Sequence, residues 1–239
     1  MPIVGGPFSP LRVGDAQPTD GRRRAFTRVT PLNSYLTTPA TLGNHVSTPD
    51  AAALDITGDI EIVAHIAPTD WTPAGGSRIV TKRIGAPGGN YEFTLEADGT
   101  LGFANSYSGG AVLKSSAATG FTDGDPKWTK VTYRDSDGRV QFFTAATSTA
   151  EPTSWAQLGT DRSQPSGFMV ADTNALWIGA IGTAFTPFGG RVYRAIVRNG
   201  IGGAAVADFN PNLYSTGSTF TSTDGLVYTL SGTAAITKA

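Results

Sequence analysis

The sequence predicts an all-β sandwich of two sheets, and three observations lead to that fold class. Gly (30) and Pro (15) are abundant among the 239 residues while charged residues make up only 15%, a composition that excludes coiled coils and charge-rich helical bundles. Aromatic residues make up 10% and the net charge is -1, so the chain has apolar surface to bury and little self-repulsion, which excludes wholesale disorder. From Leu32 onward, short alternating segments separated by turn residues predict about ten strands.

The individual strands are predicted from alternation and from turn dipeptides. In residues 60–66, Ile, Ile, Ala and Ile alternate with Glu, Val and His, which marks one buried face. Residues 91–105 predict a hairpin around Asp98-Gly99, and residues 131–142 predict a second hairpin around Asp137-Gly138. Further strands are expected at residues 176–178, 192–197 and 226–230. The chain is therefore expected to be strand-rich nearly to its end.

Helix signals are sparse. The best candidate is one or two turns over residues 49–54, with Thr48 as the cap and Pro49 at the first helical position. Two segments rich in Gly, Ser, Thr and Ala, residues 106–120 and 145–154, are expected to be long loops at the rim of the sandwich.

The first 31 residues predict an extended arm that precedes a domain over residues 32–239. Residues 1–30 contain four prolines and a net charge of +3, whereas the remaining residues carry a net charge of -4. The short arginine run could contact nucleic-acid phosphates, but docking to an acidic patch on a neighbouring subunit suits the charge segregation better, in a homo-oligomer without nucleic acid. The candidate assembly contacts are Arg12, Arg22, Arg23, Arg24, Phe26 and Arg28.

Several segments of the sequence resemble a known family. Residues 127–144, KWTKVTYRDSDGRVQFFT, look like the central hairpin of laminin-G-like domains of the concanavalin A-like superfamily, and residues 44–66 resemble the entry strand of such domains. The resemblance covers residues 31–239 and implies a two-sheet antiparallel jelly roll. The sequence of residues 44–66, together with the arm, is most similar to laminin-G-like domains in tail and surface proteins of actinobacterial phages.

Enzymatic chemistry is not expected. Glycoside hydrolysis by retaining enzymes needs two carboxyl groups about 5 to 5.5 Å apart. Glu92 and Glu96 stand four residues apart on one strand, a separation of about 13 Å at roughly 3.3 Å per residue, and Asp59 with Glu61 offers no better geometry. His45 is expected in a loop beside the Pro49 turn and His65 on the polar side of a strand, and both are expected to be structural, because no nucleophile elbow accompanies them.

No metal or other cofactor is predicted. The chain has no cysteine, which excludes thiolate sites and disulfides. The segments Asp123-Gly124-Asp125 and Asp135-Ser136-Asp137-Gly138 offer oxygen ligands that calcium prefers, but Asp and Gly are also the residues that turns need. The turn interpretation is favoured, and a rim calcium stays an open alternative.

A glycan-binding site would use exposed aromatic rings beside amides and carboxylates. Trp71, Tyr107, Trp155 and Phe188 lie in loop-like sequence and are candidates for exposed rings, the first three being the candidate glycan contacts. Trp128 and Trp177 lie in strand patterns and are expected in the core.

These observations favour a non-enzymatic structural protein of a phage virion, a minor tail or capsid decoration protein that an arm anchors to other virion proteins. A carbohydrate-binding module for glycans of the host surface is the alternative. No segment approaches the roughly 18 to 20 apolar residues of a membrane span, and residues 1–11 lack the apolar region of a signal peptide, so no membrane partner or cleaved export signal is expected.

Overall fold

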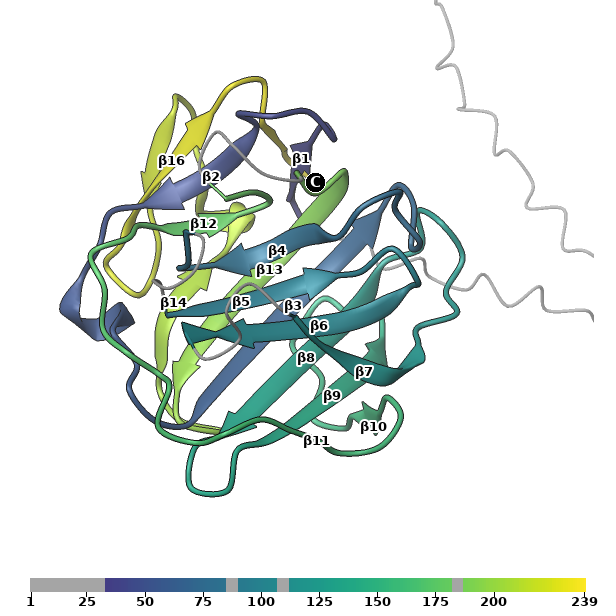
Figure 1. Cartoon of the computed structure of the whole chain (residues 1–239). Coiled ribbons are helices and arrows are strands. Elements are labelled where there is room, and N and C mark those ends of the chain that lie inside the picture. The colour runs from purple at the N-terminus through teal and green to yellow at the C-terminus, as the bar shows by residue number, and fades with distance from the viewer. Residues whose placement is uncertain (1–32, 85–89, 107–111, 182–186) are drawn as a thin grey trace, which may run out of the picture. The chain divides into compact units, whose positions relative to one another are not determined.

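The computed structural model describes residues 33–84, 90–106, 112–181 and 187–239. In these ranges the chain forms two antiparallel sheets packed face to face, the jelly-roll sandwich that the sequence predicts (Figure 1). None of the helical turns in the described ranges has the length and apolar character of a membrane span. The predicted arm, with Arg12, Arg22, Arg23, Arg24, Phe26 and Arg28, lies outside the described residues.

The first sheet, seen behind the other in Figure 1, has nine strands in the described part of the chain. Its order is β10-β9-β8-β3-β13-β1-β17, with β11 paired to β9 and β14 paired to β13. The strands are β1 (Tyr35–Thr38), β3 (Ile60–Pro68), β8 (Lys127–Arg134), β9 (Arg139–Ala146), β10 (Ala156–Gln157), β11 (Arg162–Ser163), β13 (Gly190–Asn199), β14 (Ala205–Phe209) and β17 (Ala235–Thr237).

The second sheet has eight strands in the described ranges, in the order β15-β16-β2-β12-β4-β5-β6-β7. The strands are β2 (His45–Thr48), β4 (Ser77–Thr81), β5 (Tyr91–Leu95), β6 (Thr100–Asn105), β7 (Leu113–Ala118), β12 (Leu176–Ile178), β15 (Thr219–Thr221) and β16 (Val227–Ser231). Two short 3-10 turns, η1 (Ala52–Leu54) and η3 (Pro211–Leu213), complete the described elements.

The core lies between the sheets and is built by alternation. On β3, Ile60, Ile62, Ala64 and Ile66 are fully buried in the main cluster, as their period of two predicts. Phe93 of β5 and other large side chains of the second sheet meet them from the opposite side. Full burial of one such side chain contributes about 1.5–3 kcal/mol, so the shared interior holds the two sheets together.

Both predicted hairpin turns are confirmed. β5 pairs with β6 around Gly99 (φ 75°), and β8 pairs with β9 around Gly138 (φ 67°). Both glycines take the left-handed conformation, which Gly adopts without steric cost. At Gly138 a Cβ atom would lie 1.7 Å from the carbonyl oxygen of Gln164, so only glycine fits.

Three local predictions are wrong. The predicted rim loop 106–120 contains strand β7, whose sequence LKSSAA lacks the apolar alternation that reveals a strand. The predicted helix 49–54 shrinks to η1 with Ala51 as its N-cap, and Thr48 ends β2 instead of capping. His45 lies in β2 and is buried, not in a loop.

Candidate functional site

The outer face of the eight-stranded sheet carries a cluster of polar side chains at the paired ends of β4 and β5. Tyr91, Phe93 and Leu95 of β5 point into the core, so Glu92 faces the opposite side, and Asn90 directly precedes the strand. The pairing extends beyond β4, because the Lys82 N–H donates to the Tyr91 carbonyl (2.8 Å) and the Asn90 N–H donates to the Lys82 carbonyl (3.1 Å). Lys82 therefore pairs with both Asn90 and Tyr91, and Arg83 follows it in the chain.

Glu92 lies between two guanidinium groups. Its Oε1 is 2.8 Å from Arg78 Nε and its Oε2 is 3.5 Å from Arg83 Nη1. Glu92 is 1% exposed and Arg83 is 3% exposed, so these charges are almost fully removed from water. In sequence, residues 85–89 and 107–111 contain no acidic residue. The group of two arginines and one carboxylate therefore carries one positive charge in excess.

Arg83 and Asn90 are incompletely hydrogen-bonded. Within the described part of the chain, Arg83 Nε and Nη2 have no hydrogen-bond partner, and neither do the amide nitrogen and oxygen of Asn90, which is fully buried. Buried polar groups are almost always paired, and leaving one unpaired costs about 1–3 kcal/mol. Four buried polar atoms without hydrogen-bond partners in the described ranges therefore lie on Arg83 and Asn90, at one end of the β4–β5 pair.

Trp177 lies beside this group. Its neighbours on β12, Leu176 and Ile178, are buried in the core, so Trp177 points to the outer face, where it is half-buried. In the sheet register Trp177 is opposite Thr81, and Thr81 is opposite Glu92. The expectation that Trp177 lies in the core is therefore wrong. We call this set the Arg83 cluster, and its members are Arg78, Thr81, Arg83, Asn90, Glu92 and Trp177.

The inner side of the same hairpin end is organised differently. Lys82 is fully buried, and its Nζ lies 2.8 Å from Asp50, 2.9 Å from Asp55 and 2.8 Å from Asp172. Burial alone would lower the pKa of Lys82, but the hydrogen bonds to Asp172, Asp50 and Asp55 outweigh it and the pKa is raised. Lys82 is therefore a charged anchor that ties three loop positions together.

The predicted glycan contact Trp71 has a buried ring. Trp71 is 1% exposed and packs edge-on against Phe121. Its backbone N–H donates to Asp123 Oδ1 (2.8 Å) and its Nε1–H donates to the Asp125 carbonyl (3.3 Å). The expectation of an exposed ring is wrong here, because the rim loop folds over the indole. Phe188 is also fully buried.

The two other predicted glycan contacts differ in status. Trp155 is half-buried on the outer face of the nine-stranded sheet, where Lys130 Nζ lies 4.5 Å from its ring centre. One face of this indole is thus occupied by an ammonium group. Tyr107 lies outside the described residues. Trp128 is 1% exposed, as expected, although it packs in a small separate cluster.

The acidic loops act as turn-stabilising groups. Asp123 accepts from the Trp71 backbone, as described above, while Asp135 Oδ1 accepts from the Tyr133 hydroxyl (2.7 Å) and the Gly167 N–H (2.8 Å). Asp137 pairs with Arg134, which lowers the pKa of that carboxyl to about 2. Among the residues that the structure describes, no group of three or more His, Asp or Glu is arranged to hold a metal ion.

Part of the outer face of the nine-stranded sheet, around β3 and β8, is covered by a loop, residues 147–155, which we call the strap. Thr147 Oγ1 is 2.8 Å from His65 Nε2, and Trp128 Nε1–H donates to the Ser148 carbonyl (3.1 Å). His65 is 1% exposed and stacks on Trp128 with ring centres 4.6 Å apart. Burial lowers the pKa of His65 to about 4. The polar side of β3 is therefore buried beneath the strap.

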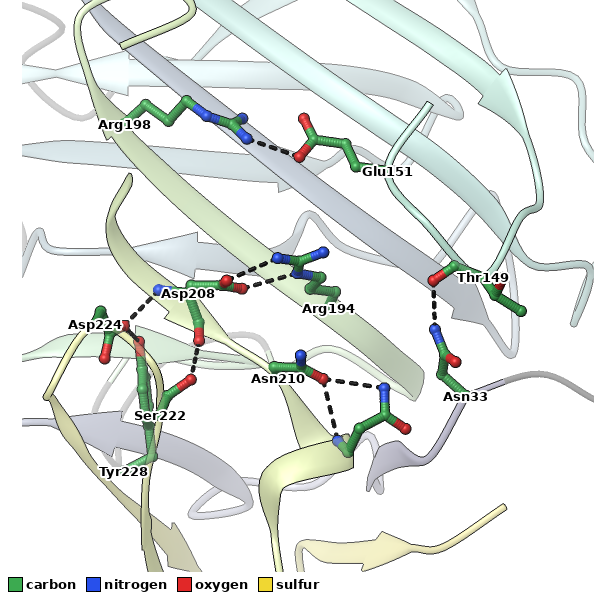
Figure 2. A network of polar contacts seen from close by, with 11 residues as sticks. Asn33, Thr149, Glu151, Arg194, Arg198, Asp208, Asn210, Ser222, Asp224 and Tyr228 are labelled. Atoms are coloured by element: carbon green, nitrogen blue, oxygen red, sulfur yellow. Dashed lines mark hydrogen bonds and ion pairs between the residues drawn. The ribbon is translucent and has the colours of Figure 1, made fainter. Parts of the chain in front are cut away.

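The arginines of this face are paired with carboxylates. Arg198 lies 2.8 Å from Glu61. Figure 2 shows its second contact, 2.7 Å from Glu151 of the strap, and the pair in which Arg194 donates through Nε (2.8 Å) and Nη2 (2.7 Å) to the two oxygens of Asp208. Glu61, one of the carboxylates considered for hydrolysis, is thus held in an ion pair.

Two adjoining hollows lie at the rim of the sandwich, with volumes of about 380 and 270 Å³. Both include Ala40, Thr69 and Gly189, and the Thr69 N–H donates to the Gly189 carbonyl (2.9 Å). Phe188, the aromatic residue that lines the larger hollow, is fully buried. These hollows therefore offer no exposed ring for a sugar to stack on.

Comparison with known proteins identifies the fold and no closer relationship. No protein-family model matches the chain, and neither does any curated protein sequence. A solved protein from Bacteroides ovatus, provisionally described as carbohydrate binding, matches with a TM-score of 0.58 at 13% identity over 87% of this chain and 61% of its own. A heptameric SAP-like pentraxin from Limulus polyphemus matches with a TM-score of 0.51 at 12% identity over 70% of this chain and 76% of its own. The fold is thus shared with these two proteins.

Proposed function

We propose that the domain binds carbohydrate through the Arg83 cluster on the outer face of the eight-stranded sheet. The observation that carries the proposal is the half-buried Trp177 on the outer face, near buried donors of Arg83 and Asn90 that have no partner in the described part of the chain. Protein sites for small molecules combine an apolar or aromatic surface with a few placed polar groups, and this cluster has both.

The chemistry of each residue suits a sugar. An indole face packs against the C–H face of a pyranose, and a carboxamide both donates to and accepts from a hydroxyl. Glu92 accepts hydrogen bonds, and its two arginine partners fix its orientation. The fold is shared with a protein provisionally described as carbohydrate binding, which adds modest support because fold does not imply function.

A glycan array tests the proposal with a matched pair of variants. Trp177→Ala is expected to weaken binding about tenfold or more, while Trp155→Ala on the other sheet, also a half-buried tryptophan, leaves the binding unchanged. Near-native circular dichroism of both variants is the folding control. Binding lost with Trp155→Ala alone would move the site to the other sheet, and an empty array with folded wild-type protein would refute carbohydrate binding.

A structural role in a phage virion is our second proposal, and it rests on the sequence. The basic residues 1–30 precede an acidic domain, a segregation that favours anchoring of the arm to neighbouring subunits of a tail or capsid. Deletion of residues 1–30 is expected to abolish incorporation into particles and to lower the oligomeric state measured by sedimentation. Wild-type occupancy of the truncated protein would refute the anchoring role. The two functions are compatible in one virion protein.

A further inference from the structure

We infer that the Arg83 cluster takes the carboxylate of an acidic sugar, with Arg83 as its anchor. This inference rests on the proposed function and specifies its ligand class. Arg83 carries a buried charge that Glu92 neutralises only in part, because the Glu92 carboxylate lies 3.5 Å from Arg83 Nη1 and closer, 2.8 Å, to Arg78 Nε. A buried charge that is not neutralised is strongly unfavourable, and a ligand with one negative charge would neutralise it.

The geometry of the Arg83 guanidinium suits a carboxylate. Nε and Nη2 of a guanidinium form one planar edge with two parallel donors, which matches the two oxygens of a carboxylate. Arg194 of this protein uses the same edge on Asp208, with distances of 2.8 and 2.7 Å. In Arg83 these two atoms are the ones without a hydrogen-bond partner in the described residues. The edge that holds a carboxylate elsewhere in the molecule is thus unpaired here.

The charge and the donors of Arg83 favour a carboxylate over a phosphate. A carboxylate carries one negative charge, which matches the single positive charge of Arg83. Its two coplanar oxygens match the two donors, Nε–H and Nη2–H, of the Arg83 edge. A phosphate group carries more charge and a third terminal oxygen, for which the cluster offers no further unpaired cation. Arg83 is only 3% exposed, so neighbouring groups must move for an anionic group to reach Nε and Nη2, and a small group requires the least movement.

Asn90 and Trp177 offer contacts for the rest of the sugar. The Asn90 amide has an unpaired nitrogen, which can donate, and an unpaired oxygen, which can accept, and this combination suits a hydroxyl group near the carboxylate. Trp177 is two strands from Asn90 in the sheet order and offers an aromatic surface for the ring. A uronic acid combines these three features, whereas a neutral hexose lacks the anion and a simple carboxylic acid lacks the ring.

The test is a titration of the full chain, followed by NMR at the Nε–H resonance of Arg83. The probes are glucuronate, acetate, glucose and inorganic phosphate. Glucuronate is expected to shift the resonance at the lowest concentration, acetate is expected to shift it more weakly, and glucose is expected to leave it in place. Arg83→Lys keeps the charge but removes the planar edge, and is expected to weaken glucuronate binding about ten- to hundredfold. Arg162→Lys, at an exposed arginine of β11, is the matched control.

The outcomes separate this inference from the proposed function. Binding of neutral glycans that Trp177→Ala removes, with no effect of any carboxylate on Arg83, would overturn the acidic ligand and keep carbohydrate binding. A shift by acetate equal to that by glucuronate would support the anion site and contradict its sugar. A shift by phosphate alone would overturn the carboxylate assignment, and so would binding that survives Arg83→Lys unchanged.

Discussion

The outer faces of the two sheets carry the same kinds of side chain but use them differently. On the nine-stranded sheet, Arg194 and Arg198 each meet carboxylates of their own chain, and the strap closes over part of the face. On the eight-stranded sheet, Arg83 meets one shared carboxylate at 3.5 Å and keeps two donors unpaired in the described residues. The first face is completed internally, and the second retains groups that a ligand could pair.

A similar contrast occurs between two adjacent residues of one strand end. Lys82 points inward and meets three carboxylates, whereas Arg83 meets Glu92 and lacks hydrogen-bond partners in the described residues for two of its three guanidinium nitrogens, Nε and Nη2. Because successive side chains of an extended segment point to opposite faces, Lys82 contacts the carboxylates of three loop positions and Arg83 contacts Glu92 on the outer face. Substitutions on the two sides should therefore affect different properties.

The largest effect is expected at Lys82. Lys82→Met keeps the length of the side chain but leaves Asp50, Asp55 and Asp172 without their shared cation. We expect a loss of about 3–5 kcal/mol in the free energy of unfolding, as for other broken buried ion pairs, measured by urea denaturation. Lys82→Arg, which retains the charge, is the control and should lose less. A loss within error of zero would show that the three carboxylates do not depend on Lys82.

The closed face should make stability depend on pH through His65. Burial lowers the pKa of His65 from 6.5 to about 4, so the unfolded state binds the proton more readily, and acidification from pH 6.5 to 4 favours unfolding. The expected loss is about 3 kcal/mol over this window. The measurement is urea denaturation at several pH values, and the loss should be smaller in His65→Phe. Equal slopes in the two proteins would contradict the buried neutral histidine.

The pair between Arg194 and Asp208 is expected to have the next effect. Arg194→Met removes two charge-assisted hydrogen bonds and leaves the buried carboxylate of Asp208 without its guanidinium partner. We expect a loss of about 2 kcal/mol. A double-mutant cycle with Asp208→Asn measures the coupling, and a coupling of zero would show that the bidentate contact is not formed in solution.

The smallest effect on stability is expected at Arg83. Arg83→Met removes unpaired buried donors while Arg78 continues to neutralise Glu92. The free energy of unfolding should stay within about 0.5 kcal/mol of the wild type or rise slightly. Loss of stability equal to that of Arg194→Met would mean that Arg83 is a structural group, and the contrast between the two faces would disappear.

The fold was predictable because its signals are local. The period of two in β3 and the Asp-Gly turns at Gly99 and Gly138 specify strands and hairpins without knowledge of the rest of the chain. Trp177 was misplaced because a three-residue strand is too short to show which alternate side chains face the core. Trp71 was misplaced because a loop-like sequence does not reveal that Asp123 and Asp125 fold over the ring.

The candidate site depends on long-range pairing and was therefore less accessible. Arg83 and Asn90 flank the segment IGAPGG, a turn signal that would have placed them opposite each other in a hairpin. The unpaired state of their side chains could not be predicted, because it depends on the contacts of every neighbouring group in the folded chain. The same holds for the paired arginines beneath the strap.

The most direct test of the ligand face is chemical-shift mapping on the labelled full chain during titration with a glycan from the array. We predict that the largest shifts fall on backbone amides of β12, β4 and β5 and on the Trp177 indole N–H. Shifts concentrated on β8, β9 and β10 around Trp155, or on the rim at residues 68–76, would contradict the account.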